Sequence, residues 1–354
     1  MLPLTTTILT VVTTLAALLW ASAPAQACTR AVYQGPNDRV LTGRSMDWKL
    51  EWDGNLWILP RGVERNGVAG PRSMSWTSKY GSVVVTGYEV ATVDGLNEAG
   101  LMVNGLWMAD AVYPTDDGRT PQMSLAIWPQ YVLDNFGTVA EAVAHAEANP
   151  FHVVSADVPD QPGRLATIHL SLSDASGDSA IFEWVDGDLV IHHGRQYQVM
   201  TNEPRFEDQL AITQYWSRVD GLSFLPGTSR AEDRFARASF LINAVDQVDD
   251  QRMAAAAVFS VMRNVSAPYG VSIEDRPNLS TTRWRVVADH KDMIYYFESV
   301  VSPNLFWVDL KNIDFSTEAG VRKLDLGPRQ QNLFSGDTSD RFVPAEPFPF
   351  LPAE

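Results

Sequence analysis

Short runs of β-branched and aromatic residues, bounded by Gly, Pro, Asn and Asp, recur in the first third of the chain and predict β-strands. They cover residues 29–33, 40–44, 56–59, 82–92 and 101–108. Turn-forming residues separate the first two runs, so these are predicted to pair as a β-hairpin. The motif DGLNEAG at residues 94–100 is predicted to be a turn between strands, in which Asn97 and Glu98 are structural and not catalytic.

Helical spacing then replaces this pattern. Met123, Ile127, Tyr131 and Val132 are predicted to share one helical face. After the break at Gly137, the sequence TVAE at residues 138–141 predicts a capping box for an Ala-rich helix that stops by Pro150.

Strand and helix patterns alternate once more in the second half of the chain. A meander of short strands is predicted over residues 165–202, helices over 231–262, and three strands at 283–288, 294–298 and 305–310. Meanders predict antiparallel sheets covered by helices, so the fold class is α+β and a four-layer αββα sandwich satisfies it. One domain is predicted over residues 28–354, with an extended tail from about residue 330.

The first 27 residues differ from the rest because they contain no charged side chain. Residues 8–20 are apolar but too few to span a bilayer comfortably, and Ala25 and Ala27 match the A-x-A pattern cut by signal peptidase. A signal peptide over residues 1–27, cut before Cys28, is therefore predicted, and it implies a periplasmic or secreted protein. An uncleaved anchor is the alternative, because no Lys or Arg precedes the apolar run.

The net charge and the cysteine content restrict the range of possible functions. The formal charge of −16 belongs to the residues after the leader and disfavours nucleic acid and anionic membranes as partners. Cys28 is the single cysteine, although an exported protein could form disulfides. A lone thiol in an oxidising compartment is buried, lipidated or catalytic. Lipidation would make the chain a membrane-tethered binding protein, but lipidation signals prefer Leu where this chain has Ala25.

A thiol on the first residue can use its own α-amino group, of pKa about 8, as the general base. Arg44 and Asp47 lie on the predicted strand antiparallel to Cys28, where Arg44 can stabilise the thiolate and Asp47 can orient the amine. The six histidines show no metal-ligand spacing, so neither a zinc site nor a cofactor is expected.

Several motifs, in collinear order, resemble those of the choloylglycine hydrolase family, which contains penicillin V acylases and bile salt hydrolases. They are Cys28-Thr29, GRSMDW at 43–48, DGLNEAGL at 94–101, TNEP at 201–204, and LPG at 225–227 followed by Arg234-Phe235. The resemblance extends from Cys28 to about Trp307. Members are N-terminal nucleophile hydrolases with an αββα sandwich and act without a cofactor.

The resemblance implies a role for five residues. Cys28 would attack the amide carbonyl, supported by Arg44 and Asp47. Asn202 would donate its side-chain amide to the oxyanion, and Arg234 would lie near the nucleophile. The family also implies a homotetramer that acts on a small acyl amide.

One departure bears on the substrate. In the bile salt hydrolase pattern an Asn stands where this chain has Trp107, whose main-chain N–H could still face an oxyanion. Trp107 and Trp48 would line an acyl pocket with flat apolar surface suited to phenoxyacetyl or fatty acyl groups. Such substitutions resemble the Gram-negative branch of the family, which includes acylases that also cleave N-acyl homoserine lactones. The alternatives are that both tryptophans are ordinary core, and that the substrate is a conjugated bile salt.

Overall fold

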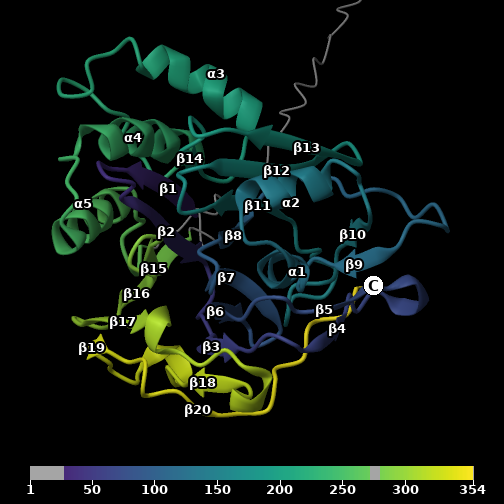
Figure 1. Ribbon diagram of the computed structural model, residues 1–354. Helices are drawn as coiled ribbons and strands as arrows, with labels where there is room; N and C mark the ends of the chain where they lie inside the picture. Colours follow the sequence, from purple (N-terminus) through teal and green to yellow (C-terminus); the bar gives the residue numbers. More distant parts are fainter. Residues whose placement is uncertain (1–27, 272–279, 354) are drawn as a thin grey trace, which may run out of the picture.

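The computed structural model describes residues 28–271 and 280–353, so the predicted signal peptide lies outside the described residues. Two large sheets dominate the molecule (Figure 1). The seven-stranded sheet has the order β14 (Val199–Met200), β1 (Thr29–Gln34), β2 (Val40–Trp48), β15 (Thr281–Asp289), β16 (Ile294–Ser299), β17 (Leu305–Asp309) and β19 (Gly336–Asp337).

The second large sheet has nine strands, all antiparallel to their neighbours. Its order is β13 (Asp188–His193), β12 (Ser179–Val185), β11 (Ile168–Ser173), β8 (Met102–Trp107), β7 (Ala91–Asn97), β6 (Ser82–Gly87), β3 (Leu56–Leu59), β18 (Arg322–Leu324) and β20 (Val343–Pro344). Two small sheets pair β4 (Glu64–Asn66) with β5 (Ser75–Thr77), and β9 (Gln122–Ser124) with β10 (His152–Val154).

In the described part of the chain, five α-helices cover the outer faces of the two large sheets or lie at their edge (Figure 1). They are α1 (Trp128–Asn135), α2 (Val139–Ala146), α3 (Phe206–Trp216), α4 (Ala231–Ala244) and α5 (Gln251–Asn264). Short 3₁₀ helices occur at Gly70–Arg72, Leu310–Asn312, Thr317–Ala319 and Pro328–Gln330. Helices α4 and α5 pack on β1, β2 and β15, whereas α1 packs on β7 and β8 and α2 on β12.

Strand alternation explains why both sheets are buried on two faces. In β6, Val83 and Val85 face the core between the sheets, and Val84 faces the cluster beneath α1 and α2. The helix, sheet, sheet, helix layering confirms the predicted αββα sandwich. Helix α5 lies so close to β2 that a Cβ at Gly43 would stand 2.6 Å from Val258 Cγ1. Only glycine fits there.

The predicted hairpin at the start of the described chain is confirmed. Strands β1 and β2 pair antiparallel, with Thr29 opposite Ser45 and Arg30 opposite Arg44. On its other edge β2 pairs with β15. The hairpin is therefore central in its sheet, and the residue at its open end, Cys28, is buried.

Three sequence predictions in the first half of the chain were wrong in detail. The strand predicted at 82–92 is instead the hairpin β6–β7, because Tyr88 and Glu89 take left-handed φ values of 54° and reverse the chain. Strand β7 then continues to Asn97, so only Glu98–Gly100 of the predicted turn at 94–100 turns. Met123 belongs to β9 and lies outside the helix, which begins at Trp128.

Predicted helices also differed in extent. The helical region at 231–262 is two helices, since α4 ends at Ala244 and Asp250 caps α5 through Met253 N. Helix α3 was not predicted, because it buries only Phe206 and Gln209 and so carries no apolar stripe. The predicted capping box of α2 is present in part: Thr138 Oγ1 accepts from Glu141 N at 3.2 Å, but the Glu141 carboxylate accepts from Gly137 N at 2.8 Å instead of from Thr138 N.

The C-terminal tail runs extended over the surface apart from two short strands (Figure 1). Phe348 is nevertheless buried, with its ring centroid 5.2 Å from that of Trp57. Within the described residues, none of the helices is long and apolar enough to cross a membrane.

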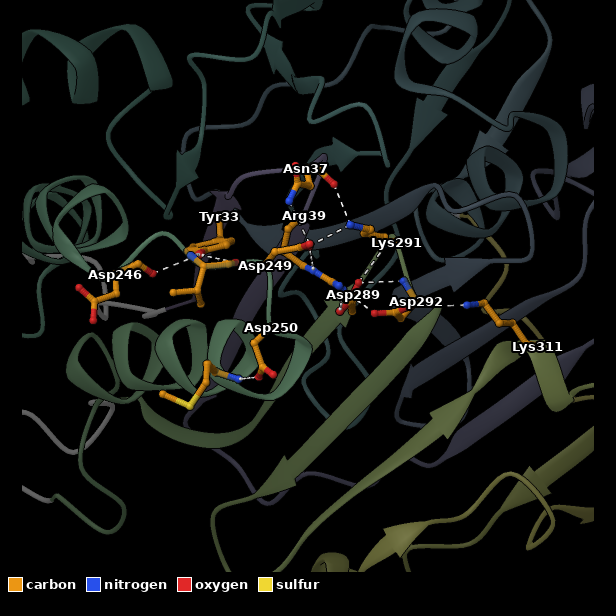
Figure 2. Close-up of polar contacts among 12 residues, drawn as sticks. Tyr33, Asn37, Arg39, Asp246, Asp249, Asp250, Asp289, Lys291, Asp292 and Lys311 are labelled. Carbon is orange, nitrogen blue, oxygen red and sulfur yellow. Dashed lines mark hydrogen bonds and ion pairs between the residues drawn. The ribbon is translucent and has the colours of Figure 1, made fainter.

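A charged network ties together the loops at the closed end of the β1–β2 hairpin (Figure 2). Arg39 Nη1 lies 2.7 Å from Asp289 Oδ2 and 2.5 Å from Asp292 Oδ2, and its Nε lies 3.3 Å from Asp249 Oδ1. Lys291 Nζ completes the network at 2.8 Å from Asp249 Oδ1. The hairpin that carries Cys28 is thus fixed to the β15–β16 turn and to the segment before α5.

We expect Arg39→Leu to lower the free energy of unfolding by about 3–5 kcal/mol, because it leaves the fully buried carboxylate of Asp289 without its guanidinium. Urea unfolding measures this loss. Adding Asp289→Asn should recover part of it, since no buried charge then remains. The control is Arg205→Ala, whose partner Asp186 is exposed and whose loss should cost less than about 1 kcal/mol. Equal losses for the two arginines would contradict the prediction.

Candidate active site

The thiol of Cys28 lies at the open end of the β1–β2 hairpin, where the residue is 2% exposed. Its Sγ is 3.9 Å from Arg44 Nη2, 3.6 Å from Met46 Sδ and 3.8 Å from the main-chain oxygen of Asp47. Burial raises the pKa of the Cys28 thiol, and the guanidinium of Arg44 opposes that rise. The hairpin therefore brings Cys28, Arg44 and Asp47 together, as the sequence predicted.

Arg44 is held rigidly beside the thiol. Its Nη2 donates to Gly105 O at 2.8 Å, and its guanidinium carbon lies 4.5 Å from the centroid of the Trp284 ring. Its Nη1 lies 3.7 Å from Asp94 Oδ2. These contacts hold the guanidinium in a fully buried position, where a positive charge stabilises a thiolate more strongly than it would in solvent.

Asp94 was predicted to belong to a turn, and this was wrong: it lies in β7 and is fully buried. Asn104 Nδ2 donates to Asp94 Oδ2 at 2.7 Å, and Tyr295 Oη donates to Asp94 Oδ1 at 2.5 Å. Burial raises the pKa of Asp94 to about 6, and Arg44 opposes the rise. Asp94 is thus the buried counter-charge of Arg44.

Asp47 is also fully buried, near the same end of the hairpin. Thr282 donates its hydroxyl to Asp47 Oδ1, and Ser45 Oγ lies 3.5 Å from Asp47 Oδ2. Burial raises the pKa of Asp47 to about 6, while Arg234 and the Thr282 hydroxyl oppose the rise. Sequence reasoning missed Thr282, because it lies more than 200 residues away and meets Asp47 only through the pairing of β15 with β2.

Arg234, on the buried face of α4, connects Cys28 to the predicted oxyanion donor. Its Nη1 donates to Cys28 O at 2.6 Å and its Nη2 to Asn202 Oδ1 at 3.0 Å. Because Asn202 Oδ1 accepts from Arg234, the amide nitrogen must face the other way, where it donates to Trp107 O at 2.6 Å. The five predicted catalytic residues and Trp107 therefore form one connected cluster.

A buried histidine, His169, holds the segment that carries Asn202. Sequence reasoning missed this residue as well. His169 Nε2 lies 2.8 Å from Thr201 O, and its Nδ1 lies 3.0 Å from Glu183 Oε1. Glu183 accepts in turn from Phe206 N, at the start of α3. The segment that presents Asn202 is thus attached to β11, β12 and α3.

An apolar cavity opens beside the Cys28 thiol and holds about 720 Å³ including its mouth. Both predicted pocket tryptophans line it, with the ring centroids of Trp48 and Trp107 5.6 Å apart. Trp48 is at the same time part of the hydrophobic core, and its Nε1 donates to Tyr88 Oη at 2.5 Å. Trp48 therefore belongs both to the hydrophobic core and to the wall of the cavity.

Two further residues, one beside the cavity tryptophans and one in the cavity wall, carried no sequence signal. The half-buried guanidinium of Arg164 lies 4.9 Å from the ring centroid of Trp107 and 5.6 Å from that of Trp48. Leu351, in the C-terminal tail, lines the cavity itself. In residues 28–271 and 280–353, His, Cys, Asp and Glu side chains form no group of three that could hold a metal ion.

A thiol beside a fixed cation, an oriented amide donor and an apolar acyl pocket can together perform nucleophilic acyl transfer. On an αββα sandwich, this site defines an amide hydrolase. The chain belongs to the choloylglycine hydrolase family of linear amide C–N hydrolases, whose family model matches residues 28–323. It is therefore a hydrolase that acts on linear amides.

Relatives of known structure or activity agree with this assignment. The chain is 49% identical to a penicillin V acylase from Pectobacterium atrosepticum over 358 aligned positions, which cover 95% of each protein. Its fold matches the solved penicillin V acylase of Agrobacterium tumefaciens with a TM-score of 0.86 and 55% identity, over 92% of this chain and 99% of that one.

A more distant match shows the fold alone. A variant of conjugated bile acid hydrolase from Clostridium perfringens aligns with a TM-score of 0.71 at 19% identity, over 85% of this chain and 98% of the other.

Proposed function

We propose that the protein is an acylase of the penicillin V acylase type, with Cys28 as its N-terminal nucleophile. The observation that carries the proposal is the position of Cys28. It directly follows the predicted signal-peptidase site, its Sγ lies 3.9 Å from Arg44 Nη2, and the residue lines the apolar cavity. Removal of residues 1–27 would expose the α-amino group on the residue that bears the thiol, and would place the enzyme in the periplasm or outside the cell.

In this mechanism the α-amino group takes the thiol proton, and the thiolate attacks the amide carbonyl carbon. Asn202 Nδ2 donates to the oxyanion of the tetrahedral intermediate, and the guanidinium of Arg44 stabilises the negative charge on the sulfur once the proton has left. The α-ammonium group then gives its proton to the leaving amine as the C–N bond breaks. Water hydrolyses the thioester, which releases the acid and restores the thiol.

The acyl group would be phenoxyacetyl or fatty acyl, so the proposed substrates are penicillin V and N-acyl homoserine lactones. The paired rings of Trp48 and Trp107 and the identity to two penicillin V acylases support this choice. A flat apolar wall suits an aryl ether or an alkyl chain better than a sterol with hydroxyl groups. The hydroxyl groups of a bound sterol would find no hydrogen-bond partner on such a wall. Hydrolysis of conjugated bile salts is the alternative. A homotetramer, expected from the family resemblance, is part of the proposal.

The test compares kcat/KM for penicillin V, a long-chain N-acyl homoserine lactone and glycocholate on the same exported enzyme. We expect penicillin V or the lactone to be cleaved at least tenfold faster than glycocholate. If glycine were released from glycocholate faster than phenoxyacetate from penicillin V, the substrate assignment would be wrong.

Trp107→Ala should raise KM for penicillin V by about tenfold or more and change kcat less, because it removes pocket surface that contacts the acyl group but no group that reacts. Steady-state kinetics with penicillin V measures both constants. Trp216→Ala is the matched control, since Trp216 lies at the end of α3 and outside the cavity. A fall in kcat with KM unchanged would contradict the prediction and give Trp107 a role in the chemical step.

A further inference from the structure

The wall of the acyl cavity includes a residue from the last few positions of the chain. Leu351 lines the cavity together with Val90, Ala91, Leu125 and Ala126. Val90 ends the β6–β7 turn and Ala91 begins β7, whereas Leu125 and Ala126 lie between β9 and α1. Neither segment contributes any of the proposed catalytic residues. Leu351 is thus part of a wall that is separate in sequence from the machinery around Cys28.

Main-chain hydrogen bonds fix Leu351 in this position. Its N–H donates to Val90 O at 2.9 Å, and its carbonyl accepts from Ser124 Oγ at 2.7 Å. Ala353 N donates to Val68 O at 2.9 Å, so the attachment continues beyond Leu351. Figure 1 shows the C-terminus lying beside β9 and the β4–β5 hairpin. These bonds hold the main chain of the tail at Leu351 against the β6–β7 turn and β9, so Leu351 is kept at the cavity that it lines.

Aromatic packing anchors the tail just before Leu351. Phe348 is 7% exposed, and its ring lies 5.2 Å from Trp57 and 4.8 Å from Phe350. Phe350 in turn lies 5.9 Å from the guanidinium carbon of Arg65. Because these anchors are independent of the Leu351 side chain, that side chain can be changed while the tail stays in place.

The tail also lies beyond the part of the chain that matches the family model, which ends at residue 323. The catalytic cluster, by contrast, lies wholly within it. A cavity wall supplied from outside the shared core can vary without altering the chemistry. In a hydrophobic pocket, one methylene of substrate changes the rate by about 10–200-fold, so one apolar side chain at the wall is enough to set a length limit.

We propose that the C-terminal tail is part of the acyl-binding site and that Leu351 limits the length of the acyl chain that the pocket accepts. This inference rests on the proposed acylase function. Replacing Leu351 with a smaller residue lengthens the apolar space, and replacing it with a larger one shortens that space.

The experiment measures kcat/KM for N-acyl homoserine lactones with acyl chains of 6, 8, 10 and 12 carbons. Leu351→Ala should increase the ratio of the 12-carbon to the 6-carbon value by about tenfold, and Leu351→Trp should decrease it by a similar factor. Val343→Ala is the matched control, because Val343 lies in the same tail, is 58% exposed and is remote from the cavity. It should leave the ratio unchanged.

A second measurement separates this inference from the proposed function. Calorimetric titration gives the dissociation constants of the free 6-carbon and 12-carbon carboxylic acids and requires no turnover. If no variant hydrolyses the lactones but the ratio of the two dissociation constants still shifts between Leu351→Ala and Leu351→Trp, the acylase proposal fails and the inference about the tail stands. If neither ratio differs between these variants and Val343→Ala by more than twofold, while melting temperatures are unchanged, the inference is wrong.

Discussion

Cys28→Ala is expected to abolish turnover, with a loss of at least about 10⁴-fold in kcat, because Cys28 is the single cysteine of the sequence and no Ser, Thr or Lys is among the described residues that line the cavity. Release of phenoxyacetate from penicillin V measures the loss. Since Cys28 is buried and the substitution removes one atom, the thermal unfolding midpoint should change little. Cys28→Ser is the matched control for volume. It should also be nearly inactive, because a serine hydroxyl gives up its proton far less readily than a thiol and is the weaker nucleophile.

The same prediction has a second part, which concerns the α-amino group. Retaining even one residue before Cys28 turns that amine into an amide, which cannot act as a base, so this form should be as inactive as Cys28→Ala. Intact mass and N-terminal sequencing of the active exported protein should both place Cys28 first. Full activity in a form that keeps residues before Cys28 would contradict the N-terminal nucleophile mechanism. A lipid mass increment on Cys28 would instead support the lipid-anchored alternative.

Arg234→Met is expected to lower kcat by about 10²–10³-fold, a loss comparable to removal of an oxyanion donor. Arg234 donates to Asn202 Oδ1, so without it the Asn202 amide can rotate and no longer presents Nδ2 to the oxyanion. It also donates to Cys28 O, so the nucleophile loses a positioning contact. Arg234→Lys should recover little, because one ammonium group cannot replace a guanidinium that donates in several fixed directions.

A double-mutant cycle checks that Arg234 acts through Asn202. Asn202→Ala should cost about as much as Arg234→Met, and the double variant should be little worse than either alone. Arg237→Met is the matched control: Arg237 lies one turn further along α4 and donates to Pro226 O and Thr228 O, away from the thiol. Fully additive losses in the cycle would show that the two residues act independently. A loss in Arg237→Met equal to that in Arg234→Met would show that the effect is only structural.

Local patterns in the sequence predicted those residues of the site that lie close to one another along the chain. Cys28, Arg44 and Asp47 lie within 20 residues, and a hairpin with a recognisable turn places them on facing strands. The side-chain period of two also fixes which residues of a strand share a face. The same local logic failed where a turn depends on unusual backbone geometry, as at Tyr88 and Glu89, or where a helix buries almost nothing, as in α3.

The sequence by itself determined which residues could carry the chemistry and how the elements are layered: one cysteine after a predicted leader, an arginine and a carboxylate on the strand beside it, and alternating strands that must be covered on both faces. Only the tertiary structure decided what surrounds that chemistry. It paired Arg44 with Asp94, joined Arg234 to Asn202, and brought Leu351 to the acyl cavity. The reason is physical. A strand pattern states which side chains point inward, but their partners are set by strand order and sheet packing between segments that are far apart in the chain.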